Sequence, residues 1–290
     1  MLSIAYLSNR LYQYALLMRL HRPIGIYLLL WSTLWAVWLA GNGHPSVFIT
    51  LIFIAGVVLM RSAGCVINDY ADRDFDPHVQ RTRDRPLATG RVSAKEALGL
   101  FIVLCLLAFG LVLQLNDLTI QLSVIALLLA AMYPFTKRYT YLPQLFLGAA
   151  YSWSIPMAFA AQLNEIPNIA WWLFTANLLW TVAYDTMYAM VDKQDDLKIG
   201  VKSTAILFGN ADKLIIALLQ LAVFILLIMV GIQENLGYIY FIGLAIASLF
   251  VFYQHWLIRH REPERCFQAF LNNHWLGATI FIGIVADYLL

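Results

Sequence analysis

Nine long apolar runs divide the sequence and limit what the chain can fold into. They cover about residues 23–40, 46–67, 96–115, 118–134, 141–162, 168–191, 214–232, 236–257 and 268–288. These lengths are close to the roughly 20 residues that a membrane-spanning helix needs. The runs are continuous rather than alternating, which excludes a transmembrane β-barrel, and a helix satisfies its own backbone groups in hydrocarbon. The sequence therefore predicts an all-α polytopic membrane protein with nine transmembrane helices.

The composition of the chain agrees with a surface that faces lipid. Of its 290 residues, 61% are hydrophobic and only 12% are charged, which is about half the charged fraction of a typical soluble domain. Residues 1–22 lack a long apolar core, so we expect an interfacial amphipathic segment there. The whole chain, residues 1–290, is then one integral-membrane domain.

The basic residues predict how the chain is oriented. If the N-terminus is cytoplasmic, all 19 lysines and arginines fall on the cytoplasmic side, because the loops after the odd-numbered runs contain none. Basic residues gather in cytoplasmic loops of membrane proteins. The far side has only four of the 17 acidic residues, which are Asp117, Glu165, Glu234 and Asp287. We therefore expect a cytoplasmic N-terminus and a C-terminus on the far side, with most charge gathered at one membrane face.

Two acidic clusters end apolar runs at this charged face. The first, "NDYADRDFD", covers residues 68–76, and the second, "YDTMYAMVDKQDD", covers residues 184–196. Residues four apart on a helix lie on one face, so a continuous helix would align Asn68, Asp72 and Asp76. The second stripe would consist of Asp185, Asp192 and Asp196. Matching stripes four helices apart suggest an internal duplication, helices 2–5 and 6–9, with the stripes facing each other across a central cavity.

Oxygen ligands in two facing clusters predict a magnesium site. Mg²⁺ is usually bound through one or two carboxylates together with substrate phosphates, so two clusters indicate two ions bridged by a diphosphate. The candidate metal ligands are Asn68, Asp72, Asp76, Asp192 and Asp196. The cations that could contact the remaining phosphate oxygens are Arg73, Lys137, Arg138, Lys198 and Lys202. Either cluster alone would more often be a solvated loop, and only their pairing favours a site.

Arg61 and Asp185 are placed differently from the other charged residues. Both fall within the predicted hydrocarbon depth, where ionisable side chains are functional candidates by default. The alternative is a mutual ion pair that only fixes helix packing.

These residues resemble the UbiA superfamily of intramembrane prenyltransferases. The first cluster matches the pattern N-D-x-x-D-x-x-x-D, and Asp192 and Asp196 match the second aspartate motif. The stretches 22–36, 133–144 and 183–209 are similar to the branch of the superfamily that acts on 4-hydroxybenzoate. The resemblance runs from about residue 19 to the C-terminus, and Asp69 also occupies a position of the family's first motif.

The resemblance implies a fold, a location and an activity. Members have nine transmembrane helices around a cavity that opens sideways to lipid, with Mg²⁺ at the two motifs. The chain would lie in a bacterial inner membrane, with a periplasmic C-terminus. It would transfer a polyprenyl group from polyprenyl diphosphate to the carbon ortho to the hydroxyl of 4-hydroxybenzoate, an early step of ubiquinone synthesis. Besides its two substrates, membrane lipid is the one expected partner, and neither nucleic acid nor a protein partner is expected.

Specific roles follow as hypotheses from the same resemblance. Asp69, Asp185 and Arg61 are the candidate catalytic residues, and either aspartate could take a proton from the acceptor. The acceptor carboxylate needs a cation, for which the candidates are Arg22, Arg61 and Arg138. Another aromatic acceptor, such as a naphthoate or homogentisate, a haem vinyl group as acceptor, and a membrane transporter remain as alternatives.

Overall fold

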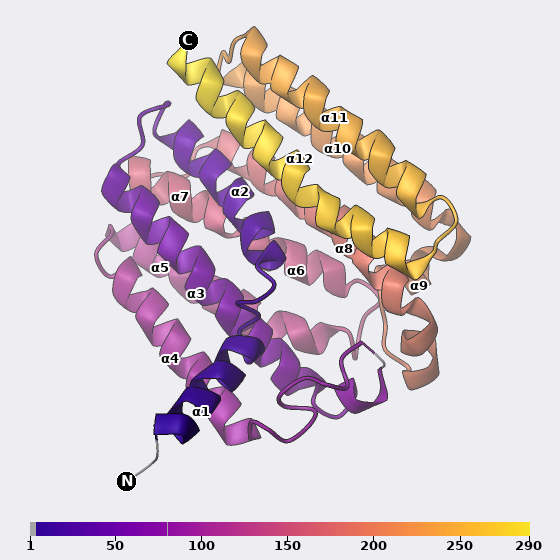
Figure 1. Ribbon diagram of the computed structural model, residues 1–290. Helices are drawn as coiled ribbons and strands as arrows, with labels where there is room; N and C mark the ends of the chain where they lie inside the picture. Colours follow the sequence, from indigo (N-terminus) through magenta and orange to yellow (C-terminus); the bar gives the residue numbers. More distant parts are fainter. Residues whose placement is uncertain (1–3, 80) are drawn as a thin grey trace.

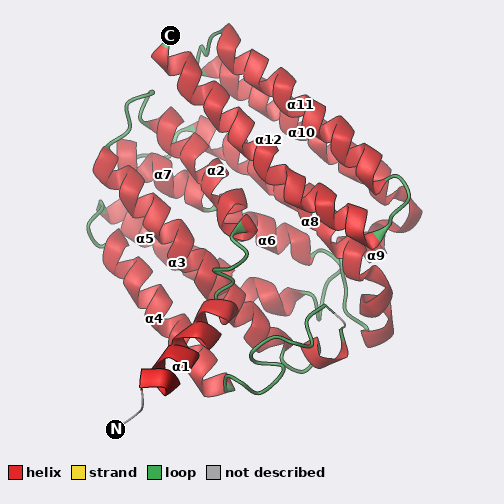
Figure 2. Cartoon of the chain, in the orientation of Figure 1, coloured by secondary structure: helices red, strands yellow, loops and turns green. Residues whose placement is uncertain are grey.

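The computed structural model describes residues 4–79 and 81–290, and every regular element in that part of the chain is a helix (Figure 2). The elements are α1 (Ile4–Leu17), α2 (Ile24–Ala40), α3 (Val47–Asp72), η1 (Asp76–His78), α4 (Ala94–Val112), α5 (Asp117–Thr136), α6 (Pro143–Ser152), α7 (Ser154–Leu163), α8 (Asn168–Ile199), α9 (Thr204–Phe208), η2 (Gly209–Ala211), α10 (Asp212–Gln233), α11 (Tyr238–Ile258) and α12 (Pro263–Leu289). The predicted all-α fold class is confirmed.

The helices fall on the nine apolar runs, with one division that the prediction lacks. The fifth run is split at Trp153 into α6 and α7. Pro156 has no N–H to donate to residue 152, which weakens the backbone ladder at this point. Within the described residues, six stretches are long and apolar enough to cross a membrane; they are Val47–Asp72, Ala94–Val112, Asp117–Thr136, Thr204–Gln233, Tyr238–Ile258 and Pro263–Leu289. The count of nine crossings stays a prediction.

Helix α3 corrects the prediction of one continuous stripe through the first acidic cluster. It begins at Ser46, whose side chain accepts a hydrogen bond from Ile49 N, and it ends at Asp72. The chain then turns, and Asp76 opens the short helix η1. Pro77 follows Asp76, and a proline disfavours the α conformation of the residue before it. Asp76 therefore reaches the site from a turn and not from the helix that carries Asn68 and Asp72.

The long helix α8 organises the packing of the bundle. It packs against α6, α10 and α12, and α12 also packs against α2 and α11. Trp35 of α2 stacks on Trp180 of α8 with ring centroids 5.2 Å apart. Both indoles donate hydrogen bonds to α12, Trp35 to Gly277 O at 3.0 Å and Trp180 to Asn273 Oδ1 at 2.9 Å. Figure 1 shows α3, α4 and α5 on one side of this centre and α10, α11 and α12 on the other.

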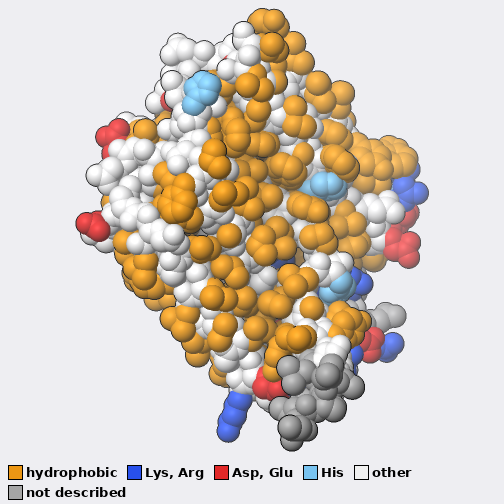
Figure 3. All heavy atoms as spheres, turned by 60° about the vertical axis from the view of Figure 1, so that its left-hand side comes forward, with side chains coloured by type: hydrophobic (Ala, Val, Ile, Leu, Met, Phe, Trp, Pro, Cys, Tyr) orange, Lys and Arg blue, Asp and Glu red, His pale blue; other side chains and the backbone are white. Residues whose placement is uncertain are grey.

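The outer surface is largely apolar, as a lipid-facing surface must be. Hydrophobic side chains cover most of the face in Figure 3, and the basic side chains visible there lie toward its lower end and right edge. Large side chains such as Leu106 and Phe252 are more than half exposed. Helix α1 is joined to the start of α4, because Arg10 pairs with Glu96 and Tyr14 donates to the same carboxylate at 3.1 Å. The interfacial position of α1 stays a prediction.

Candidate functional site

A polar cavity of about 310 Å³ brings the two acidic clusters together. Its walls come from α2, α3, α5, α6, α8 and α12, from the segment before α2 and from the segment after α3. The predicted site residues that line it are Arg22, Arg61, Asn68, Asp69, Asp72, Asp76, Lys137, Asp185, Asp192, Asp196 and Lys202. The structure therefore places both clusters at one cavity, as the paired stripes predicted.

Each aspartate of the first cluster has a cationic partner. Asp69 is fully buried and accepts two hydrogen bonds from Arg19 Nη2, at 2.7 and 3.0 Å. Arg85 Nη1 lies 3.0 Å from Asp69 and donates to Asp76 at 2.9 Å. Lys137, directly after α5, forms an ion pair with Asp72. These cations compensate the carboxylates, which would otherwise repel one another in a buried position.

The second cluster is tied to the first across the cavity. Arg81 donates through Nε to both carboxylate oxygens of Asp192, at 3.0 and 3.1 Å, and through Nη2 to Oδ2 at 2.5 Å. Its guanidinium carbon also lies 4.8 Å from the ring centroid of Tyr188. Arg81 belongs to the segment that follows the first cluster, whereas Asp192 and Tyr188 belong to α8. A bidentate guanidinium–carboxylate pair fixes geometry as well as charge, so it holds the two motifs in register.

The surroundings of Asp76, in the turn after α3, change the pKa of its carboxyl group. Burial, together with the nearby Asp72 and Asp69, raises the pKa of Asp76 to about 6. Arg85 lowers the pKa but does not cancel these effects. A carboxyl group with this pKa exchanges its proton near neutral pH.

Three predicted diphosphate contacts lie outside the cavity lining. Arg138 donates to Ala71 O at 2.5 Å and lies over the ring of Phe75. Arg73 donates to Tyr70 O at 2.9 Å, and Lys198 is largely exposed and pairs with an acidic neighbour on α8. All three are therefore engaged with backbone or surface groups rather than with the cavity.

Three arginines that the sequence analysis did not select as site residues also line the cavity; they are Arg19, Arg81 and Arg85. In the stretch "RTRDRPL" the arginines fit either a site or a topology signal equally well. The structure separates them, since Arg81 and Arg85 point to carboxylates, whereas Arg83 is mostly exposed and pairs with Asp84 at 3.9 Å. The spacing of four between Arg81 and Arg85 could indicate a shared site only if the conformation of this segment was known.

The donor set fits Mg²⁺. Asp72 Oδ1 is buried and contacts the ammonium of Lys137, while Asp72 Oδ2 accepts from Asn68 Nδ2 at 3.2 Å, so the oxygens of this carboxylate lie at the cavity among polar groups. Among the described residues, no three His, Cys, Asp or Glu side chains are close enough to hold a metal by themselves. Mg²⁺ typically keeps several waters and is held by one or two carboxylates plus substrate phosphates. The cavity thus offers two partial sets of oxygen ligands that a diphosphate would complete.

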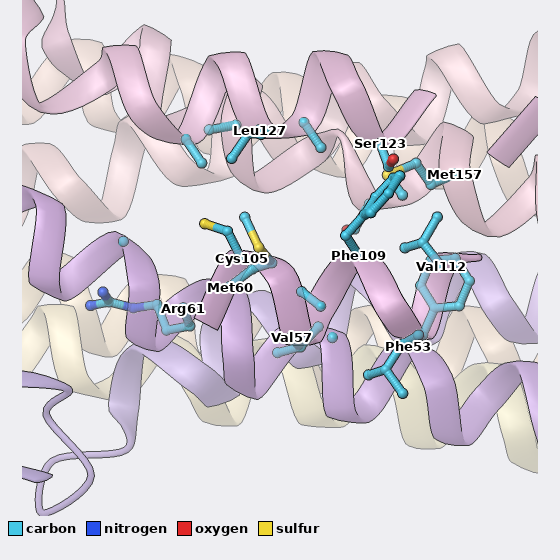
Figure 4. Close-up of a pocket in the computed structure, with 18 of the residues that line it drawn as sticks. Phe53, Val57, Met60, Arg61, Cys105, Phe109, Val112, Ser123, Leu127 and Met157 are labelled. Atoms are coloured by element: carbon cyan, nitrogen blue, oxygen red, sulfur yellow. The ribbon is translucent and has the colours of Figure 1, made fainter. Parts of the chain in front are cut away.

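A second cavity, of about 520 Å³, adjoins the polar one and is almost entirely apolar. Arg61, Tyr133 and Tyr151 line both cavities and so mark their junction. In Figure 4 the side chain of Arg61 lies at one end of this cavity, with its guanidinium directed away from Phe53 and Val112. A polar head and an apolar chain of one molecule could therefore occupy the two cavities at once.

The apolar cavity reaches the outer surface between α4 and α5. Several of its lining side chains are also exposed on the outside of the bundle; these are Ile102, Leu106, Phe109, Val124 and Leu127. Because these side chains face lipid in a membrane, the cavity opens sideways into the bilayer.

The comparison with protein-family models matches residues 29–277 to the UbiA prenyltransferase family. The chain belongs to this family. The membership inferred from the two aspartate motifs is confirmed. The matched segment includes both motifs and the residues at the junction of the two cavities.

Relatives of this UbiA chain span nearly its whole length. A protein of Nitrosococcus oceani named 4-hydroxybenzoate octaprenyltransferase is 62% identical over 98% of this chain and 99% of its own length. A protein of Pseudomonas aeruginosa with the same name is 57% identical over 99% of this chain and 97% of its own. Similarity at this level covers the site together with the scaffold that positions it.

Solved structures of other UbiA homologues share the fold. The apo structure of a homologue from Aeropyrum pernix has a TM-score of 0.80 and 26% identity, covering 91% of this chain and 98% of that one. A homologue from Archaeoglobus fulgidus, solved with GPP and Mg²⁺, has a TM-score of 0.73 and 18% identity over 96% of this chain and 100% of that one. The arrangement of helices in this UbiA chain is therefore that of a known membrane-enzyme fold.

Proposed function

We propose that the chain transfers a polyprenyl group, in the first instance octaprenyl, from its diphosphate to the carbon ortho to the hydroxyl of 4-hydroxybenzoate. The observation that carries this proposal is the junction of an acid-lined polar cavity with an apolar cavity open to lipid. The names of the relatives, 4-hydroxybenzoate octaprenyltransferase, support the choice of acceptor. The chain works as one domain, residues 1–290, in a bacterial inner membrane with its charged loops in the cytoplasm.

The diphosphate head binds between the two acidic clusters. The residues that would hold Mg²⁺ are Asn68, Asp72, Asp76, Asp192 and Asp196. Bound Mg²⁺ supplies neutralisation of the charge that develops on the departing diphosphate. Binding of GPP and Mg²⁺ by the Archaeoglobus homologue supports this assignment.

Basic side chains of the cavity complete the binding of the phosphate oxygens. Lys137, Arg81 and Arg85 already line the cavity and contact the carboxylates. When a diphosphate is present, these cations lie within reach of its oxygens and add charge-assisted hydrogen bonds. Arg22 and Lys202, at the rim of the cavity, supply further positive charge.

The prenyl chain extends from the junction into the apolar cavity. Its aliphatic lining excludes water from the allylic carbon, which protects the cation that forms when the carbon–oxygen bond ionises. Tyr133 and Tyr151 line both cavities at the junction, and the faces of aromatic rings attract cations. The longer part of the chain leaves through the opening between α4 and α5.

Arg61 is the best placed of the three arginines considered for the acceptor carboxylate. Its Nε is buried without a hydrogen-bond partner, and an unsatisfied buried donor favours a ligand that can accept. Arg138 lies outside the cavity lining, and Arg22 is exposed at the rim. A carboxylate on Arg61 places the acceptor ring at the junction, next to the allylic carbon.

Asp185 is the better candidate of the two for proton transfer. The oxygens of Asp69 already accept hydrogen bonds from Arg19. Among the ion pairs of the described residues, none involves Asp185, which lines the cavity from α8. Asp185 can therefore accept a proton from the phenol or the ring without first breaking an ion pair.

A transfer assay in liposomes tests the proposed function. Radiolabelled 4-hydroxybenzoate is incubated with a long-chain polyprenyl diphosphate, with and without Mg²⁺, and label is counted in the lipid extract. Magnesium-dependent transfer is the expected result. Transfer to another aromatic acceptor alone would overturn the acceptor, and inertness of folded protein toward every prenyl diphosphate would favour a transporter.

A further inference from the structure

Gly25 lies in the first turn of α2 and lines the polar cavity beside Arg61 of α3. A Cβ added at Gly25 would lie 2.6 Å from Cζ of Arg61, and nearer still to its Nε and Nη2. Real Cβ atoms essentially never make contacts this short, so the guanidinium would have to move. We propose that Gly25 is a positioning residue, whose missing side chain sets where the Arg61 guanidinium sits at the junction of the two cavities.

The other contacts of Arg61 are too weak to hold its guanidinium alone. Nη1 donates to Cys65 Sγ at 2.6 Å, and Cζ lies 6.0 Å from the ring centroid of Tyr151. A thiol is a weak acceptor, and a cation over an aromatic face is a modest attraction. Among the described residues, no ion pair to Arg61 is formed, so packing against the backbone of Gly25 decides its orientation.

Gly25 differs from other glycines of the bundle in what surrounds it. A Cβ at Gly277 would lie 2.6 Å from the ring of Trp180, and a Cβ at Gly41 would meet the backbone of Pro45 at 2.5 Å. Those neighbours are rigid, so a side chain there would strain the fold. At Gly25 the obstacle is the free end of a flexible side chain, which can swing aside.

Gly25→Ala is therefore expected to separate activity from stability. Alanine forms helices better than glycine, so the melting temperature stays the same or rises. The displaced guanidinium no longer meets the acceptor carboxylate, a consequence that rests on the proposed function. We expect KM for 4-hydroxybenzoate to rise about 10- to 100-fold, as for a misplaced binding group, while KM for the prenyl diphosphate changes by less than about twofold.

The test is a double-mutant cycle between Gly25→Ala and Arg61→Ala, with Gly99→Ala of α4 as the matched control. A Cβ at Gly99 meets nothing within 4 Å, and Gly99 lines neither cavity. Each variant is reconstituted in liposomes, its melting temperature is measured, and product is counted by radiolabel so that slow variants remain measurable. If Gly25 acts through Arg61, Gly25→Ala has no further effect on KM for the acceptor in the Arg61→Ala background.

Two results would overturn the positioning role. One is an unchanged KM for 4-hydroxybenzoate in Gly25→Ala, and the other is a rise that persists in full without Arg61. If KM for 4-hydroxybenzoate is unchanged in Gly25→Ala but raised in Arg61→Ala, only the positioning role of Gly25 is contradicted. An unchanged KM in Arg61→Ala contradicts the proposed role of Arg61 itself, so the two failures are distinguishable.

Discussion

The polar and apolar cavities meet at three residues but are built on different principles. In the polar cavity, carboxylates and cations contact one another at defined distances, such as Arg81 with Asp192 and Arg85 with Asp76. The apolar cavity is lined mainly by aliphatic and aromatic side chains that recognise only volume. This difference implies that discrete contacts would bind the polar head of a substrate, whereas only the available volume would limit its apolar chain. Single substitutions should therefore have large effects in one cavity and graded effects in the other.

Removing a carboxylate from the polar cavity should have the largest effect. We expect Asp192→Ala to lower kcat/KM by about 10³-fold or more, because it removes a proposed metal ligand and the partner of Arg81. Asp195→Ala is the matched control on the same helix, since Asp195 pairs with Lys198 at the surface and does not line the cavity. The initial rate of prenyl transfer in liposomes measures both. An active Asp192→Ala would mean that the second cluster is not part of the site.

Removing a cation from the same cavity should cost less. Arg85→Ala leaves Asp69 and Asp76 without their shared partner, so we expect a loss of about 2 kcal/mol in stability and about 30-fold in kcat/KM. Arg83→Ala, two residues away and exposed, should change neither quantity. Thermal unfolding in detergent and the transfer rate measure the two effects. Equal behaviour of the two variants would show that the arginines act only as a topology signal.

The positions of the helices could be predicted from the sequence better than the places where helices are interrupted. Lipid requires long apolar helices, so the helices fall close to the apolar runs. The errors came from prolines, since Pro77 ends the expected stripe and Pro156 marks the division between α6 and α7. Both prolines were visible in the sequence, but a prediction from helical spacing and apolar run length does not take account of proline.

Only the part of the site that lies on regular helices could be predicted from the spacing of residues. Asp72 and Asp192 lie on helices, where positions along the sequence specify a face. Their partners Lys137 and Arg81 come from elsewhere in the chain, and Arg81 lies in an irregular segment where no period relates sequence to direction. The apolar cavity was expected only through the family resemblance, because a cavity is a property of packing between helices.

Filling the apolar cavity should affect long donors more than short ones. Ala126 of α5 lines this cavity, and a phenylalanine there would occupy space that the distal chain needs. We expect Ala126→Phe to lower kcat/KM about tenfold for octaprenyl diphosphate and to leave geranyl diphosphate almost unchanged. Leu128→Phe, exposed on the same helix and outside the cavity lining, is the control. Equal losses for both donors would show that chain volume is not what this cavity recognises.

Acidification should lower the affinity of the polar cavity for Mg²⁺ without affecting the apolar cavity. With a pKa of about 6 for Asp76, its carboxylate is mostly ionised at a pH well above 6 and mostly protonated below it. A carboxylate that binds a metal must be deprotonated, so protonation of Asp76 alone should lower the apparent affinity for Mg²⁺ about fourfold between roughly pH 7.5 and pH 5.5. Protonation of Asp196, whose pKa burial raises to about 7, should lower it further. Mg²⁺ titrations of prenyl transfer at each pH measure this. In Asp76→Asn the apparent affinity for Mg²⁺ should be lower at high pH, and its fall between the two pH values should be smaller. An unchanged fall would show that another group causes the pH dependence.

Charges outside both cavities should have the smallest effect on activity. Asp287, near the end of α12, accepts hydrogen bonds from Gly237 N at 2.6 Å and Tyr240 N at 3.2 Å, and so caps the start of α11. We expect Asp287→Ala to lower stability by about 1 kcal/mol, as for a lost N-cap, and to leave prenyl transfer intact. Glu165→Ala, an exposed charge between α7 and α8, should change neither quantity. Loss of transfer in folded Asp287→Ala would place part of the machinery at the end of the bundle opposite to the two aspartate motifs.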